Sequence, residues 1–248
     1  MNRLTLFIFS ICIITAGQNT TSADWKDTYI VTLKPVHNLS SDFKVDWYKP
    51  GEAAMFSKEP GNIKSLPEFG YDTQRYIALY LGDTNDNQFT GVIDFDSRDK
   101  NTYPAFDLYL DRDRDGDLAE DFIVDKANVK LEVPYEGAPP QEYHIRIYSV
   151  RNDGNVRIIY QCLTVRYGFI NKDDTQIPLL IMEDTPNGVF NNSDDFILMD
   201  WDLDGKLDGS HQTKGYLPLF SDLNLPGATF TVTSLDPAGQ ELTLQKLK

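Results

Sequence analysis

Two short acidic runs have the residue types and spacing that could hold a metal ion. Both read Asp-x-Asp-x-Asp-Gly, the first at 111–116 and the second at 200–205. Three carboxylates at alternating positions repel one another unless a cation or protonation offsets their charge. The glycine stands where the backbone must turn sharply. Oxygen ligands crowded into a tight loop suit a hard cation, so the runs predict Ca²⁺ sites.

The second run offers the more complete set of oxygen ligands. Aspartates stand at its first, third, fifth and ninth places, and Lys206 at the seventh place can offer its backbone carbonyl. His211 stands at the twelfth place, where such loops usually have an acid, so an acid from elsewhere or water must complete the shell. The predicted ligands are Asp200, Asp202, Asp204, Lys206 and Asp208.

The first run is less well supplied with ligands. Ala119 stands at its ninth place, and Glu120 and Asp121 follow, so one of these acids could close the site if the loop is one residue shorter. Two other acidic segments, Asp83–Asn87 and Glu183–Asp194, fit the pattern only in part and are weaker candidates. The predicted ligands of the first run are Asp111, Asp113, Asp115, Asp117 and Asp121.

An interpretation without metal stands beside this one. The Asp-Gly pair in each run also suits a two-residue hairpin turn. Arg112 and Arg114 could neutralise the first run without a cation. Among metals, Mg²⁺ would prefer fewer protein ligands and more water. Zn²⁺ would need a cluster of Cys or His, and the sequence shows no such cluster.

The spacing of both runs resembles known calcium loops. It is similar to the loops of EF-hands, dockerins, thrombospondin type 3 repeats and integrin-type propeller blades. This resemblance covers the loops alone, because strands rather than EF-hand helices are expected beside them. The strand-flanked pair also looks like uncharacterised secreted bacterial proteins with such loops, and like β-rich segments upstream of thioredoxin-like domains. The thioredoxin Cys-x-x-Cys is missing from the sequence, so that chemistry does not carry over.

Strands must position these runs. Alternation and β-branched or aromatic content predict an all-β, β-sandwich-like fold, with one short helical turn expected near Leu118–Phe122. The expected strands are Tyr29–Leu33, Tyr76–Leu81, Phe106–Leu110, Val129–Val133, Tyr143–Val150, Val156–Tyr160, Ile177–Met182, Phe196–Met199, Thr229–Ser234 and Glu241–Lys246.

An internal repeat places the two runs at equivalent points. The segment Phe106–Leu118 matches Asp195–Leu207 around the acidic runs. Further on, residues 143–158 match 229–244, and each piece reads as a strand, a glycine-containing turn and a second strand. Matched runs in matched contexts favour a shared structural role over coincidence.

The repeat divides the chain. A third match pairs Ala78–Phe89 with Leu179–Phe190. We therefore expect a β unit with a calcium loop at 71–161 and a second at 162–248, preceded by a lead-in or edge strands at 24–70. Two separate domains and two halves of one sandwich remain alternatives.

The N-terminal residues predict export. Residues 1–23 contain a positive start at Arg3, an apolar run at Leu4–Ile14 and small residues at the end, which are features of a signal peptide. The apolar run is short for a membrane span, and no other segment is apolar enough to cross a bilayer. We expect a secreted, periplasmic or cell-envelope location, with Cys162 left as a buried strand cysteine.

Composition and motifs limit the possible functions. The formal net charge of −15 argues against nucleic acid and anionic membranes as partners. No nucleophile elbow, zinc-protease or phosphate-loop motif is present. We expect a non-catalytic, calcium-stabilised cell-envelope or extracellular module, with extracellular polysaccharide or a cell-surface protein as a further partner. The alternatives are a glycoside hydrolase-like enzyme acting on extracellular polysaccharide and a carbohydrate-binding module.

Overall fold

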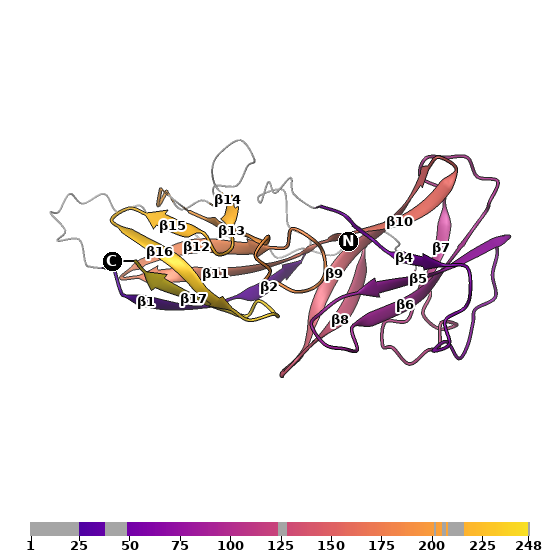
Figure 1. Ribbon diagram of the computed structural model, residues 1–248, viewed down its shortest axis with the longest axis horizontal. Helices are drawn as coiled ribbons and strands as arrows, with labels where there is room; N and C mark the ends of the chain where they lie inside the picture. Colours follow the sequence, from indigo (N-terminus) through magenta and orange to yellow (C-terminus); the bar gives the residue numbers. More distant parts are fainter. Residues whose placement is uncertain are drawn as a thin grey trace, which may run out of the picture.

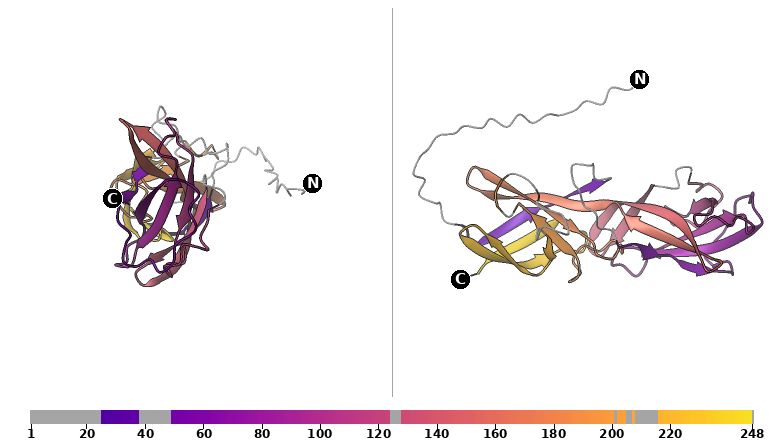
Figure 2. Two further views of the ribbon diagram at one scale, coloured as in Figure 1. Left: turned by 90° about the vertical axis from the view of Figure 1, so that its right-hand side faces the viewer. Right: turned by 90° about the horizontal axis from the view of Figure 1, so that it is seen from above.

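The computed structural model describes residues 25–37, 49–123, 128–200, 202–204, 207 and 216–247. Within these residues there is no helix, and every sheet is antiparallel, which confirms the predicted all-β, sandwich-like class. The helical turn expected near Leu118–Phe122 is wrong: Leu118 and Ala119 form an isolated turn. The described part of the chain is elongated, with two lobes end to end (Figures 1 and 2).

Two four-stranded sheets make the first lobe, in the orders β4-β5-β6-β7 and β3-β10-β9-β8. Their strands are β3 (Gly51–Glu52), β4 (Ala54–Phe56), β5 (Thr73–Tyr80), β6 (Gln88–Phe95), β7 (Phe106–Leu110), β8 (Val129–Tyr135), β9 (Ala138–Asn152) and β10 (Asn155–Cys162).

The second lobe has a five-stranded sheet, β14-β13-β12-β11-β2, and a four-stranded sheet, β1-β17-β16-β15. Its strands are β1 (Thr28–Thr32), β2 (Lys34–His37), β11 (Thr164–Lys172), β12 (Thr175–Met182), β13 (Phe196–Met199), β14 (Tyr216–Pro218), β15 (Asp222–Leu225), β16 (Ala228–Leu235) and β17 (Glu241–Lys246).

The two lobes have the same topology apart from β14, which has no counterpart in the first lobe. In each, a three-stranded meander (β5-β6-β7 or β11-β12-β13) precedes an acidic run, and a second meander (β8-β9-β10 or β15-β16-β17) forms the other sheet. The N-terminal segment supplies outer strands to all four sheets: β1 and β2 join the second lobe, and β3 and β4 join the first. The acidic runs therefore follow equivalent strands.

One of the three sequence matches is displaced by a strand. It paired the end of β5 with the end of β12, but β12 is the middle strand of its meander, as β6 is in the other lobe. By position in the sheet, β6 is the counterpart of β12. The other two matches agree with the topology, because they pair β7 with β13, and β9 and β10 with β16 and β17.

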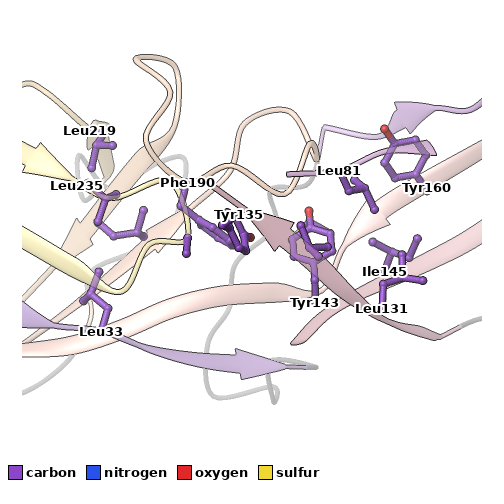
Figure 3. Close-up of a cluster of buried hydrophobic side chains, with 14 of the residues drawn as sticks. Leu33, Leu81, Leu131, Tyr135, Tyr143, Ile145, Tyr160, Phe190, Leu219 and Leu235 are labelled. Carbon is purple, nitrogen blue, oxygen red and sulfur yellow. The ribbon is translucent and has the colours of Figure 1, made fainter. Parts of the chain in front are cut away.

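A continuous core joins the lobes. Between β10 and β11 only Leu163 intervenes, so the chain passes directly from one lobe into the other. Buried side chains run through the junction, where Tyr135 and Tyr143 of the first lobe lie beside Phe190 of the second (Figure 3). The rings of Tyr143 and Phe190 meet edge to face, with centroids 6.3 Å apart. The junction is thus packed, and not a loose linker.

Two further features bear on the predictions. Cys162 is buried and unoxidised, as expected for a strand cysteine. Within the described residues no helix is long and apolar enough to cross a membrane. The expected signal peptide, residues 1–23, lies outside the described residues.

Candidate metal centres

The two acidic runs form two carboxylate triads. Asp111 directly follows β7, and Asp200 directly follows β13. In each triad the possible ligand atoms lie within 4.8 Å of one another; the triads are Asp111, Asp113, Asp115 and Asp200, Asp202, Asp204. The first aspartate of each triad is buried, and the other two are exposed. Each run therefore presents one carboxylate from the interior and two from the surface to the same point.

The backbones of the two runs follow the same path. At the fourth place, Arg114 and Leu203 both have a φ of 63°, a conformation uncommon for residues other than glycine. At the fifth place, Asp115 N–H donates to Asp113 at 3.3 Å and Asp204 N–H donates to Asp202 at 3.2 Å, so the same hydrogen bond closes both runs. Both runs are built to gather carboxylates around one centre.

Asp121 follows the turn and feels the charges of the first triad, although it lies outside the group of three converging carboxylates. It is buried, and Arg112 Nε lies 3.5 Å from its Oδ1. Burial raises the pKa of Asp121 to about 6, the Arg112 charge opposes this, and the charges of Asp113 and Asp111 raise the pKa further. Burial likewise raises the pKa of Asp111. Without a nearby cation, the site therefore disfavours the ionised form of these two carboxyl groups.

Two oxygens at this site are left without partners. Asp111 Oδ1 and Asp121 Oδ2 are buried and have no hydrogen-bond partner among the described residues. Buried polar atoms are nearly always satisfied, because a lost water contact is costly. A cation between these carboxylates would satisfy both oxygens.

Asp117 is not one of the three carboxylates of the first triad. The Asp117 carboxylate accepts from Ala119 N–H at 3.0 Å and so stabilises the turn that follows. The predicted role of Asp117 as a ligand stays a prediction. Lys206 and Asp208 lie outside the described residues, so their predicted roles stay predictions.

The first run is not the hairpin turn of the metal-free interpretation. Tyr109 and Phe122 pair across it in an isolated antiparallel bridge, so the loop between them is much longer than a two-residue turn. The run instead packs against an upstream segment, where Lys64 N–H donates to Gly116 O at 2.8 Å and Leu118 N–H donates to Ser65 O at 3.1 Å. Arg114 extends away to Asp86 and over the Phe89 ring. It is therefore occupied elsewhere than at the triad.

The weaker acidic segments serve the lobe junction. Glu183 is buried, accepts from Asn187 and Val189 N–H at 3.1 Å each, and accepts from Tyr143 OH at 2.5 Å. Burial raises the pKa of Glu183 to about 7, although these hydrogen bonds lower it. In the other segment, Asp83 accepts from a backbone N–H at 2.8 Å. These acids accept hydrogen bonds that hold the fold, and ion binding by these segments stays a prediction.

A further cluster was missed by sequence reasoning. His37 on β2 and His144 on β9 stack with ring centroids 4.0 Å apart, and Glu142 reaches both rings. The three side chains could hold a metal, so the expectation that the chain has no histidine cluster is wrong. The Glu-x-His spacing on β9 was readable as one face of a strand. The approach of His37 depends on long-range strand pairing.

The aromatic residues bear on sugar binding. Trp25 is buried, meets Phe230 edge to face at 5.3 Å, and donates to Pro226 O at 3.1 Å. This tryptophan serves the core of the second lobe and does not form part of an exposed sugar-binding strip. Trp47 and Trp201 lie outside the described residues.

Comparison with known proteins gives no relative. No family model, curated protein sequence or solved structure matches this chain.

Proposed function

We propose that this chain is a secreted calcium-binding β protein, a non-catalytic cell-envelope or extracellular module whose lobes are each stiffened by one Ca²⁺. A single observation carries the proposal: both acidic runs wrap the same backbone path, with φ of 63° at Arg114 and Leu203, around a buried first aspartate. A shared loop geometry with three convergent carboxylates favours a shared ligand over two independent turns.

Ligand chemistry supports Ca²⁺. The triads offer only carboxylate oxygens, and backbone carbonyls lie nearby, which is the ligand type that Ca²⁺ takes in flexible geometry. At the first site the buried, unpartnered oxygens of Asp111 and Asp121 add to this set. A divalent ion would offset the effects that raise the pKa of both carboxyls, which are burial first and the charges of neighbouring aspartates second.

Position in the fold supports a stabilising role. The first run ties the end of β7 to the segment that contains Lys64 and Ser65, through backbone hydrogen bonds at Gly116 and Leu118. An ion held by the run would fix this attachment. Extracellular modules with such ligands often bind Ca²⁺ at about 10⁻⁴–10⁻³ M, so the ion acts as a clamp where calcium is plentiful.

Charge and the N-terminal sequence support the location. The net charge of −15 favours cations over polyanions as ligands. The signal-like residues 1–23 would direct the chain to compartments where free calcium reaches such concentrations.

Calcium calorimetry on the chain that begins after residue 23 tests the proposal. We expect saturable binding of two Ca²⁺ per chain, and Asp111→Asn and Asp200→Asn should each remove one site. Each variant is checked by circular dichroism for retained β structure. Calcium binding that neither substitution alters, or no binding at millimolar Ca²⁺, would refute the proposal.

A further inference from the structure

A compact group of metal-ligand side chains lies at the junction between the lobes. His37 ends β2 in a sheet of the second lobe, whereas Glu142 and His144 lie on β9 in a sheet of the first. Glu142 Oε1 lies 3.5 Å from His37 Nε2 and 2.7 Å from His144 Nε2. One possible ligand atom from each residue falls within 4.8 Å of the other two.

The backbone around the group presents both imidazoles to Glu142. Residues two apart on a strand share one face, which places Glu142 and His144 side by side. Thr164 Oγ1 accepts from the backbone N–H of His144 at 2.7 Å and lies 3.0 Å from Nδ1 of the His37 ring. With Nδ1 held by this hydroxyl, Nε2 of His37 faces the carboxylate. Metal-binding histidines are commonly oriented through their other ring nitrogen in this way.

We infer that His37, Glu142 and His144 form a second kind of metal site, for a transition-metal dication of the Zn²⁺ class. Imidazole nitrogens suit zinc, copper and nickel, while the acidic loops with oxygen ligands suit calcium. Two imidazoles and one carboxylate leave a fourth position of a tetrahedral site for water. All three side chains are partly exposed, so an ion can reach them. This inference does not rest on calcium binding.

Two cations would compete with the metal. Lys130 pairs with the other oxygen of Glu142, and Arg166, which is fully buried on β11, acts on His37 through its charge. A bound metal would share Glu142 with Lys130 and would sit against the repulsion of Arg166. We therefore expect selective but moderate affinity and a gain when Lys130 is neutralised.

The site would join the two lobes. Its ligands come from β2 and β9, which belong to different sheets and approach each other at the junction. An ion bound to both strands would resist their separation. Metal at this site should therefore raise the stability of the whole chain and not of one lobe alone.

The test is Zn²⁺ calorimetry and Co²⁺ absorption spectroscopy on the chain saturated with Ca²⁺. We expect one Zn²⁺ site that excess Ca²⁺ does not displace, and visible Co²⁺ bands of a four-coordinate site that Zn²⁺ abolishes. His37→Gln and His144→Gln should each weaken Zn²⁺ binding by more than the roughly 10–100-fold that an outer-shell partner supplies. Lys130→Met should strengthen binding, and Glu241→Gln, at an exposed position of β17 away from the group, is the matched control.

The outcomes are distinct. Zn²⁺ binding that His211→Gln removes while His37→Gln and His144→Gln leave it unchanged would overturn the inference, as would the absence of a Zn²⁺ site in the folded wild-type chain. Zn²⁺ displaced by Ca²⁺ would assign it to the acidic loops and also overturn the inference. Loss of Zn²⁺ binding in both histidine variants, with calcium binding the same as in the wild-type chain, would support it.

Discussion

Arg114 and Leu203 hold the same left-handed backbone, with a φ of 63° at the fourth place of the two acidic loops. Their side chains have nothing in common: one is a cation over the Phe89 ring, and the other is an apolar residue packed beside the core. The matching conformation therefore follows from the loop and not from these side chains. A loop that places three carboxylates around one point in both lobes is the structural basis of the proposed calcium sites.

The Asp-x-Asp-x-Asp-Gly runs should bind calcium, whereas the weaker segment at Asp83–Asn87 should not contribute to either site. Asp204→Ala should abolish one of the two Ca²⁺ sites, because Asp204 belongs to a carboxylate triad. Asp83→Ala should leave both sites intact, because the Asp83 carboxylate accepts from Glu136 N–H and belongs to no such triad in the described residues. Calorimetric stoichiometry measures the difference, and equal effects of the two substitutions would contradict the assignment.

The stability and calcium affinity of the first loop should depend on glycine at position 116, where the backbone lies close to an upstream carbonyl. Gly116 has a φ of 86°, and a Cβ atom there would lie 2.5 Å from Asn62 O. Gly137 has a φ of 72° with open space around it, so Gly137→Ala measures the cost of the left-handed backbone alone, about 1–2 kcal/mol. Gly116→Ala should cost more in urea unfolding and should also weaken calcium binding. Equal losses of stability would show that the loop can move away from Asn62.

Stability should fall as the pH rises through the range where Glu183 ionises. Its pKa is raised by burial from the ordinary 4.5 to about 7, so the folded state binds more protons than the unfolded state within that window. The contribution is fully present below pH 4.5 and is lost as the pH passes 7, a change on the order of 3 kcal/mol. Asp195, with a pKa raised by burial to about 8, acts in the same direction.

Glu183→Gln tests this dependence, since glutamine is neutral throughout and keeps an oxygen for the backbone N–H groups of Asn187 and Val189. The slope of unfolding free energy against pH should become shallower between pH 4.5 and 7. Glu132→Gln, at an exposed position of β8, is the control and should keep the wild-type slope. An unchanged slope in Glu183→Gln would show that another group governs the pH dependence.

Local sequence patterns predicted most of the strands. Each expected strand lies on an observed one, because half-buried strands such as β7 alternate buried and partly exposed residues. Two central strands were missed for physical reasons. In β6 nearly every residue is buried, so alternation is lost. In β11, Gly168 weakens the pattern, although it is needed where a Cβ atom would meet Leu33 and Thr32.

The candidate sites were likewise predictable only where their residues lie close together in the sequence. The carboxylate triads were predictable because each occupies a short stretch of sequence and its spacing sets its geometry. Spacing alone leaves the role of Asp117 open, because its carboxylate accepts from the Ala119 N–H and lies outside the triad. The group of His37, Glu142 and His144 could not be predicted, since it depends on β2 crossing to the second lobe while β9 stays in the first. Pairing between distant strands leaves no local signal.

Thermal unfolding with and without calcium tests the central claim most directly. If free Ca²⁺ exceeds the dissociation constant tenfold, each site adds about 1.4 kcal/mol. Two sites should then raise the melting temperature by about 5–10 °C relative to EGTA, and Mg²⁺ at the same concentration should restore much less. A melting temperature that is the same in EGTA and in millimolar Ca²⁺ would contradict the account.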